Sequence, residues 1–290
     1  MATPAVSSAV SSQRARAQRT LRWELLSQLV RKDLKIKYQG SALGFTWSLA
    51  NPLLMMGIYY LIFGVVLSNG IPGFAIYIMC GLLPWMAFSA AVAAASGSVL
   101  GNAGLVKKVR FPLEVLPLSA VGYALVHFVL QLGVLVVVSF VYRQDISPAF
   151  LLLVPATALL VLFATALSYL VAALNVRYRD TAHVVEIALM VWFWLNPVLY
   201  QSTLVKGHLQ GLFWLYFLNP MATVVTTFQR AIFVKDTYVD STGATRHILA
   251  DPGYLFYARN LAIGFAIAGL AFYLARRVFV RLQADFAEEL

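Results

Sequence analysis

The residue types that most often carry out chemistry are sparse and scattered in this sequence. The histidines are His127, His183, His208 and His247, which lie in four different segments, and no His-x-x-x-His or Asp-x-x-Asp pair occurs. Catalytic and metal-binding side chains must lie close together. A His-x-x-x-His or Asp-x-x-Asp pair would achieve this, because its two side chains lie near each other on one helix. The Gly-x-x-x-x-Gly-Lys-Ser/Thr pattern of a phosphate-binding loop is also absent. We therefore predict that this chain is no enzyme, holds no metal or cofactor, and does not itself bind ATP through such a loop.

Two ionisable residues, Glu186 and Arg259, stand inside otherwise apolar runs. An ionisable residue within a membrane span is a functional candidate by default. Both lie near the ends of their runs, however, where a side chain reaches water or pairs with a neighbour. Their roles stay open at this point.

Aromatic and amide side chains recur every four residues in two apolar runs. If each run is helical, this spacing places them along one face. Two such stripes facing each other would form a passage suited to sugars, whose C–H faces pack on rings while their hydroxyls hydrogen-bond. The alternative is an interfacial aromatic belt for Trp47 and Tyr200 and helix packing for the other residues. The predicted conduit residues are Trp47, Asn51, Met55, Tyr59, Phe63, Trp192, Asn196 and Tyr200.

A short segment, Gly101 to Glu114, combines three features of a docking loop. It carries positive charge, an apolar side, and a Phe-Pro pair that ends any helix. The apolar side suits insertion into a cleft of another protein, whereas the charges alone would be explained by membrane topology. The residues concerned are Leu105, Val106, Lys107, Lys108, Val109, Arg110, Phe111 and Pro112.

The composition of the chain predicts which kind of secondary structure positions these residues. The chain has 290 residues, of which 61% are apolar and only 12% charged, with a mean hydropathy of +0.77. A soluble globule is excluded, and an all-α integral membrane protein is predicted. The net charge of +10 is divided among short segments between apolar runs, which favours a role in membrane orientation over binding of nucleic acid. We expect no nucleic-acid partner.

Six apolar runs are long enough to cross a bilayer as helices. Lys and Arg number 16 in the segments on one side of these runs and 5 on the other, with Arg259 assigned to a run. The positive-inside rule then places both termini in the cytoplasm. The predicted spans are Phe45–Leu67, Ala75–Leu100, Val115–Tyr142, Pro148–Val176, Thr181–Tyr200 and Tyr254–Ala275.

The remaining segments divide the chain further. We predict that residues 1–20 form a disordered lead-in. Residues 21–40 are predicted to form an amphipathic interface helix with Leu21, Leu25 and Leu29 on one face. The transmembrane domain is predicted to cover residues 41–275, and a cytoplasmic tail residues 276–290. Residues 209–234 are apolar but contain Asn219-Pro220 and Arg230. We predict that they form short re-entrant helices in the outer leaflet between the fifth and sixth spans.

Five motifs in order resemble the membrane subunit of ATP-binding-cassette polysaccharide exporters, the family that exports O-antigen, teichoic acid and related lipid-linked glycans. The resemblance covers nearly the whole chain beyond residue 20. The motifs are RKDLKIKYQGSALGFTWSLANP from Arg31 to Pro52, GLLPW from Gly81 to Trp85, NAGLVKKVRFP from Asn102 to Pro112, NVRYRD from Asn175 to Asp180, and LNP from Leu218 to Pro220.

The resemblance implies a homodimer of this chain with two copies of a separate ATPase, which would bind ATP and Mg. The family's architecture implies that residues 21–37 and 102–114 contact the ATPase, with Asn175 to Asp180, which includes Arg177, Tyr178, Arg179 and Asp180, as a second contact. It also implies that the first and fifth spans line the conduit. The implied location is the plasma membrane of a bacterium.

By the same resemblance, a finished lipid-linked glycan (O-antigen, teichoic acid or galactan type) would enter from the cytoplasm and be moved outward by ATP hydrolysis in the partner. Arg31, Lys35 and Lys37 would guide the pyrophosphate of its lipid carrier, although membrane topology also explains these charges. Two alternatives remain open: an exporter of drugs or small lipids with the same architecture, and an intramembrane glycan or lipid transferase.

Overall fold

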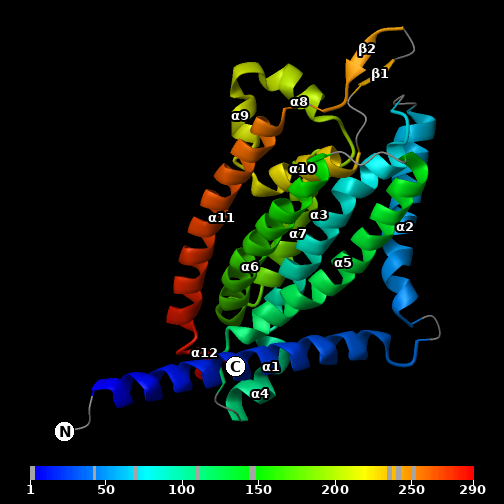
Figure 1. Cartoon of the computed structure of the whole chain (residues 1–290). Helices are drawn as coiled ribbons and strands as arrows, with labels where there is room; N and C mark the ends of the chain where they lie inside the picture. Colours follow the sequence, from blue (N-terminus) through cyan, green and yellow to red (C-terminus); the bar gives the residue numbers. More distant parts are fainter. Residues whose placement is uncertain are drawn as a thin grey trace.

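A computed structural model of the chain shows a bundle of long helices (Figure 1). The structure describes residues 4–41, 44–67, 71–108, 111–143, 148–233, 237–239, 243–249 and 253–290. The predicted α-helical membrane class is confirmed, with one short β-hairpin added.

Five helical segments among the described residues are long and apolar enough to cross a membrane. They are α2 (Trp47–Tyr59) with its π-helical continuation Tyr60–Val66, α3 (Phe74–Ser96), α5 (Val115–Arg143), the 3-10 turn Pro148–Leu152 with α6 (Leu153–Arg177), and α11 (Tyr254–Leu282). A further 3-10 turn, Gly44–Thr46, leads into α2. These segments correspond to the predicted spans one, two, three, four and six.

The fifth predicted span is a shorter helix than its sequence run. α7 covers Thr181–Trp194, only 14 residues, whereas the sequence predicted a span up to Tyr200. At 1.5 Å per residue α7 is about 21 Å long, less than the roughly 30 Å of a hydrocarbon core. Pro197 explains the early end, because proline lacks an N–H and disfavours helical backbone at the residue before it.

One end of the bundle, which we call the α1 end, is closed by short and amphipathic elements. Helix α1 (Pro4–Tyr38) lies across the bundle, and α4 (Ala103–Lys108), α12 (Phe286–Glu289) and the C-terminus lie at the same end (Figure 1). The 3-10 turn Leu100–Asn102 leads into α4. The first described helix, which begins at Pro4, and the C-terminal helix therefore lie at the same end of the bundle.

Helix α1 begins earlier than the sequence predicted. It starts at Pro4, so most of the predicted disordered lead-in is helical. Ala, Arg and Gln favour helices, and no Gly or Pro interrupts residues 5–38. Within α1, Leu25, Leu26, Leu29 and Val30 are half-buried, whereas Leu21 and the neighbouring Trp23 are exposed. The predicted apolar face thus packs on the bundle from Leu25 onward.

The C-terminal segment, predicted as a cytoplasmic tail, is helical and packed on the bundle. α11 continues seven residues beyond Ala275 to Leu282, and Phe286 of α12 is fully buried against Phe279, with ring centroids 5.5 Å apart. Burial of this aromatic ring ties the end of the chain to the bundle.

The opposite end carries two short helices, a 3-10 turn and a β-hairpin. They are α8 (Ser202–Leu209), the 3-10 turn Gln210–Leu212, α9 (Phe213–Tyr216), and the strands β1 (Thr237–Val239) and β2 (Thr245–His247). The strands are antiparallel, and Thr237 pairs with His247. Below them lies α10 (Pro220–Ile232). At about 20 Å this helix is too short to cross a bilayer, and all its residues except Arg230 are buried. It is a short helix inside the protein.

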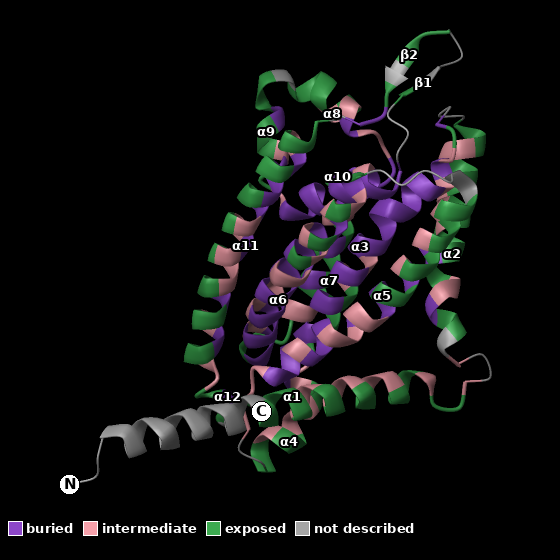
Figure 2. Cartoon of the chain, in the orientation of Figure 1, coloured by how far each residue is buried: buried purple, intermediate pink, exposed green. Residues whose placement is uncertain are grey.

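Burial is very unequal among the long helices (Figure 2). The most apolar stretch of each helical segment shows the difference. In α3, 72% of the residues of this stretch are buried within the chain, whereas in the α2 segment only 6% are buried. The main core surrounds α3 and α10, and a second core at the α1 end includes Val99, Leu116, Tyr169 and Phe279. Most of the α2 surface is therefore left for lipid or for another protein.

Candidate functional site

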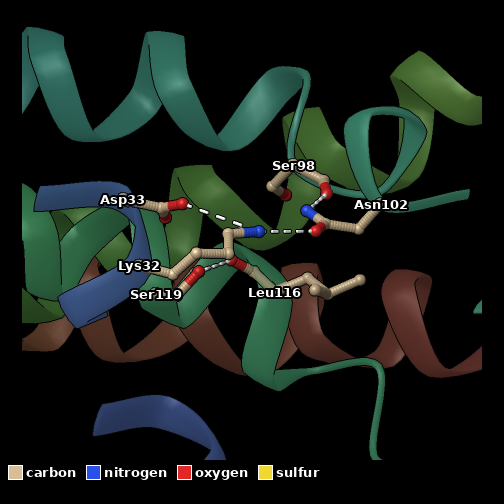
Figure 3. Close-up of polar contacts among 6 residues, drawn as sticks. All are labelled: Lys32, Asp33, Ser98, Asn102, Leu116 and Ser119. Carbon is tan, nitrogen blue, oxygen red and sulfur yellow. Dashed lines mark hydrogen bonds and ion pairs between the residues drawn. The ribbon is translucent and has the colours of Figure 1, made fainter. Parts of the chain in front are cut away.

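The first candidate site is the α1 end, where α1 is tied to the turn between α3 and α4. The Lys32 ammonium donates to Oδ1 of Asn102 at 3.0 Å, and the Asn102 amide donates to the carbonyl of Ser98 at 2.8 Å (Figure 3). Asp33 lies 3.8 Å from the same ammonium. The predicted coupling segment after Asn102 is thus attached directly to α1.

Glu114 links three further elements at this end. Its carboxylate accepts from Nε of Arg276 in α11 at 3.0 Å and lies 3.7 Å from Nη1 of Arg22 in α1. Only 14% of this side chain is exposed, compared with about half of each arginine. Glu114 immediately precedes α5, where the helix dipole also favours a negative charge. One carboxylate therefore connects α1, α5 and α11.

Asn175 ties the second predicted coupling segment to the first. Its amide donates to the carbonyl of Ser96 at 2.8 Å, and its Oδ1 accepts from the backbone N–H of Ala182 at 3.2 Å. The side chain is buried. The turn between α6 and α7 is thereby held beside the last residue of α3, so the two segments lie on one end of the bundle.

The predicted coupling residues divide into exposed and packed groups. Val106 and Phe111 pack against the core at the α1 end, while Leu105, Lys107 and Lys108 are exposed. In the second segment Arg177, Tyr178, Arg179 and Asp180 are all exposed, and the Arg177 guanidinium lies 5.8 Å from the Tyr178 ring centre. Val109 and Arg110 fall outside the described residues. The exposed residues form a basic, partly apolar surface.

The first predicted conduit stripe winds around α2 and does not form one wall. A four-residue step on a helix of 3.6 residues per turn drifts by about 40°, so the four positions from Trp47 to Tyr59 turn through roughly 120°, and Phe63 follows in the π-helical segment. Trp47 and Asn51 lie beside the end of α1 and α5, whereas Tyr59 stacks on Phe193 of α7 with ring centroids 6.0 Å apart. Met55 is exposed and Phe63 is half-buried against the core.

The second predicted stripe points largely into its own subunit. Trp192 packs edge-on against Phe88 and Phe163, and Nε1 of Trp192 donates to Oδ1 of Asn219 at 3.2 Å. Asn196 is only 1% exposed and its Oδ1 accepts from the Asn219 amide at 3.0 Å. Both side chains are therefore engaged within this subunit.

Asn219 holds this network together and starts α10. Its Oδ1 also accepts from the backbone N–H of Met221 at 3.1 Å, a helix N-cap. The nearby non-helical backbone is satisfied by side chains as well. Gln229 donates to the carbonyl of Pro197 at 2.6 Å, and the Tyr77 hydroxyl donates to the carbonyl of Tyr200 at 2.8 Å. Non-helical backbone at membrane depth is tolerated only when it is enclosed by protein in this way or lines a watery cavity.

Tyr200, the last residue of this stripe, is half-buried. Its hydroxyl donates to the carbonyl of Trp194 at 3.0 Å and lies 3.1 Å from the hydroxyl of Tyr216. It therefore closes the end of α7 on α9.

The proline in α2 also leaves a backbone carbonyl without its helical hydrogen-bond donor, and a residue of α5 supplies one. Pro52 has no N–H, so the carbonyl of Ser48, four residues earlier, lacks its helical donor. The amide of Gln131 donates to this carbonyl at 2.7 Å and is itself buried. A polar residue in the third span thus completes the backbone of the first.

Of the three cations predicted to guide a pyrophosphate, Lys37 differs from the others in position. Arg31, Lys35 and Lys37 are all exposed. Within the described part of the chain, Lys37 is the one of the three that lies over an aromatic ring, 5.2 Å from the centre of Tyr123, beside a small cavity. The adjacent Tyr38 hydroxyl approaches Nδ1 of His127 at 3.5 Å. Partial burial raises the pKa of Tyr38 above its ordinary value, against an opposing effect of Lys37, so this phenol is neutral at physiological pH.

The two isolated ionisable residues have local partners. Glu186 lies 3.9 Å from Nδ1 of His183 one turn earlier, with both side chains largely exposed. Arg259 lies over the ring of Phe256 at 5.7 Å. These contacts favour local roles at the span ends.

Sequence reasoning missed the polar residues that hold the site together. Gln131 and Asn219 were not among the predicted site residues. Lys32, Glu114 and Asn175 lay inside predicted contact segments, but their bonds within the chain were not predicted. Asn102, Asn175 and Asn219 do stand inside the motifs that carry the family resemblance, which was the available signal. Their partners lie far away in the chain, so their roles depend on the fold.

Comparison with known proteins agrees with this geometry. The family model described as ABC-2 type transporter matches residues 24–233. The chain is 40% identical to the O-antigen export system permease protein RfbA of Myxococcus xanthus over 75% of this chain and 83% of that protein. It is 34% identical to the RfbA protein of Klebsiella pneumoniae over 74% and 82%, respectively. It is 22% identical to the polysialic acid transport protein KpsM of Escherichia coli over 81% and 89%. The resemblance read from the motifs is confirmed, and the chain belongs to the ABC-2 type transporter family of membrane proteins.

Proposed function

We propose that this chain is the membrane-spanning subunit of an ATP-driven exporter that moves lipid-linked polysaccharide across the bacterial plasma membrane. The observation that carries the proposal is the 40% identity to an O-antigen export permease over 83% of that protein's length. A weaker match to a polysialic acid transport protein also has a glycan as its cargo by name. O-antigen, teichoic acid and galactan remain the candidate cargo types.

The structure supports a six-span topology with both termini in the cytoplasm. α1 and α12 lie at the same end of the bundle, and a chain that starts and ends on one side must cross an even number of times. Five crossings come from the long helices. α7 and the enclosed segment 195–200 together supply the sixth, since their joint length suffices and their backbone groups have internal partners. The basic α1 end faces the cytoplasm under the positive-inside rule.

The short elements between α7 and α11 then lie at the outer side. α10 enters the bundle without crossing it, with Thr226 and Thr227 bonding to carbonyls of its own helix. Together with α8 and α9 it forms the re-entrant closure of the outer end in this proposal.

A separate ATPase docks on the α1 end. The exposed faces of α1, α4 and the α6–α7 turn form its contact, which includes the exposed Lys107, Lys108 and Tyr178. As the family resemblance implies, two ATPase copies and two copies of this chain make the working exporter. ATP would be bound in the partner, since the sequence of this chain has no phosphate-binding loop.

The conduit follows the uncovered surface of α2 between two copies of the chain. Trp47, Asn51 and Met55 are exposed there, and an amide on a span surface is unfavourable against lipid tails. A second copy or a passing glycan gives Asn51 hydrogen-bonding partners. Trp192 and Asn196 do not form part of this exposed surface, because Asn219 joins them inside the subunit.

Depleting the protein in its host tests the proposal. Lipid-linked polysaccharide is extracted from inner and outer leaflets after labelling with radioactive sugar, and its distribution is compared with that of undepleted cells. Accumulation at the cytoplasmic face supports export and identifies the cargo by its sugar composition. An unchanged distribution would refute the proposal and favour a drug exporter or a transferase.

A further inference from the structure

An apolar groove, which we call the lateral groove, runs along the surface formed by α5, α6 and α11. Its volume is about 840 Å³. Among the described residues its lining includes no charged side chain and no residue of α2 or α7, so it lies apart from the conduit surface proposed above. The groove is lined chiefly by Leu118 and Leu132 of α5, by Val154, Val161 and Tyr169 of α6, and by Phe272 of α11.

The lateral groove is long enough for a hydrocarbon chain. Along α6 it extends from Leu153 to Tyr169, and Tyr169 belongs to the core at the α1 end. At 1.5 Å per residue this stretch is about 24 Å long, compared with about 15 Å for one half of a hydrocarbon core of roughly 30 Å. Val154 is 73% exposed, so the groove opens on the outer surface of the bundle. An acyl chain that starts at the α1 end therefore stays inside the groove throughout its leaflet.

Two arginines and one carboxylate lie at the α1 end of the lateral groove. Glu114 stands one helical turn before Leu118, and Arg276 one turn after Phe272, so each continues the helix face that lines the groove. Nε of Arg276 donates to Glu114 at 3.0 Å, and Nη1 of Arg22 lies 3.7 Å from the same carboxylate. The groove thus leads from the apolar part of the bundle to a charged cluster at the level where α1 crosses it (Figure 1).

This cluster has an excess of positive charge that remains accessible. Arg22 and Arg276 are each about half exposed, whereas Glu114 is only 14% exposed. A guanidinium has five N–H donors in a fixed fork, and the bond from Arg276 to Glu114 uses the one on Nε. The other donors suit a phosphate, which guanidinium groups bind through paired hydrogen bonds. Trp23, next to Arg22, is 71% exposed, as is typical of a tryptophan at the level of lipid head groups.

We propose that this surface binds an anionic phospholipid of the bilayer, with its phosphate against Arg22 and Arg276 and one acyl chain in the lateral groove. Charge favours an anionic lipid, because two cations share one carboxylate in the cluster and basic pockets between membrane helices attract anionic head groups. The groove favours a lipid over a free phosphate, since a lipid also packs along the apolar lining.

The bound lipid fastens α1 to α5 and α11 by adding a second negative charge to the cluster. This site goes beyond the proposed function, because it holds a lipid of the surrounding membrane on a face away from the conduit and does not involve the cargo.

The test is lipid retention by the purified full-length chain in detergent, measured by native mass spectrometry. The probe is phosphatidylglycerol. The comparisons are phosphatidylethanolamine, which has the same acyl chains but no net charge, and glycerol 3-phosphate, which has the phosphate but no acyl chain. We expect phosphatidylglycerol to be retained about tenfold better than either, the scale of one charge-assisted hydrogen bond.

Two substitutions break the same ion pair but should change retention in opposite directions. Arg276→Gln removes a phosphate ligand and should weaken retention of phosphatidylglycerol about tenfold. Glu114→Gln removes the carboxylate that competes with the phosphate and should strengthen retention about threefold. Lys206→Gln, on α8 at the opposite end, also removes one positive charge and should leave retention unchanged.

A second pair of variants tests the lateral groove. Val161→Trp should fill the groove and lower the retention of phosphatidylglycerol, whereas Val184→Trp, at an exposed position on α7, should retain the lipid normally. Thermal unfolding of each variant checks that the fold is intact. Added phosphatidylglycerol should also raise the unfolding temperature of the unchanged chain more than that of the Arg276→Gln protein.

Four outcomes would each refute the proposal. Equal retention of phosphatidylethanolamine would show no selection for negative charge, and equal retention of glycerol 3-phosphate would exclude the lateral groove from binding. Equal losses of retention in Glu114→Gln and Arg276→Gln would reduce the cluster to a structural ion pair. Dissociation of a dimer by Val161→Trp, with normal lipid retention, would assign the groove to a second copy of the chain.

Discussion

Gln131 replaces a hydrogen bond that the backbone of α2 cannot make. Asn175 and Asn219 do comparable work, because each satisfies backbone groups left open where a helix ends. A buried backbone group without a partner costs about 1–3 kcal/mol, and lipid offers no water as a substitute. These amides fix the relative positions of helices that are far apart in sequence.

Gln131→Leu should lower the free energy of unfolding by about 1–3 kcal/mol, since the Ser48 carbonyl loses its donor. Pro52→Ala restores a backbone N–H at this position and should make the same Gln131 substitution much less costly. Thermal unfolding of the four proteins of this double-mutant cycle measures the coupling. Equal costs in both backgrounds would show that the amide acts elsewhere.

Asn175→Leu keeps the approximate volume of the side chain but removes both of its backbone bonds. We expect a loss of stability of about 1–3 kcal/mol and greater protease sensitivity in the α6–α7 turn. Asn175→Asp serves as the comparison, because its carboxylate still accepts from Ala182 but cannot donate to Ser96. If Asp behaves like the unchanged protein, the bond to Ser96 is dispensable, whereas equal losses in Leu and Asp would mean that the bond from Ala182 adds nothing.

At the scale of the elements, the packing of α1 on α5 depends on a close approach. A Cβ atom placed on Gly122 would lie 2.9 Å from Cγ2 of Val30, while one on Gly133, in the same helix, meets nothing within 4 Å. Valine is stiff at χ1, so the contact is relieved only if α1 shifts. The seam between these helices therefore requires glycine at one position and not at the other.

Gly122→Ala should loosen α1, with a cost of about 1–3 kcal/mol from overpacking, detected as faster proteolysis of α1 in detergent. Gly133→Ala should be neutral or slightly stabilising because alanine favours helix. Adding Val30→Ala should restore α1 protection in the Gly122→Ala protein. Equal protection of α1 in both single variants would contradict the close contact.

The helical elements were largely predictable from the sequence. The side chains that hydrogen-bond to the backbone groups left open where helices end were not. Charge-free runs located five spans because bilayer thickness fixes helix length. The end of α7 at Trp194 also had a local signal in Pro197, but the partners that enclose 195–200, Tyr77 and Gln229, depend on tertiary packing. In the same way, the four-residue spacing of the α2 stripe was visible in the sequence. That its residues contact two different parts of the bundle could be seen only in the structure.

For the whole molecule, the proposed function assigns the positive charge at the α1 end two roles, in membrane orientation and in docking of the ATPase. Lys107→Glu with Lys108→Glu should reduce export more than tenfold, since reversing charge across an interface costs several kcal/mol, while membrane insertion continues. Lys206→Glu, on α8 at the opposite end, is the matched control. Export of labelled polysaccharide and co-purification of the ATPase are the measurements. Normal export by the double variant would move the docking surface away from α4.

The six-span topology makes a separate prediction that distinguishes it from any odd number of crossings. Single cysteines at Trp23 in α1 and Glu288 in α12 should react with a membrane-impermeant maleimide only after spheroplasts are permeabilised, because both positions lie at the α1 end and are exposed. A cysteine at Thr245 in β2 should react in intact spheroplasts. The native Cys80 is fully buried and supplies an unreactive background. Labelling of Trp23→Cys and Glu288→Cys from opposite sides would mean that α7 does not complete a crossing, since only an even number of crossings returns the chain to its starting side.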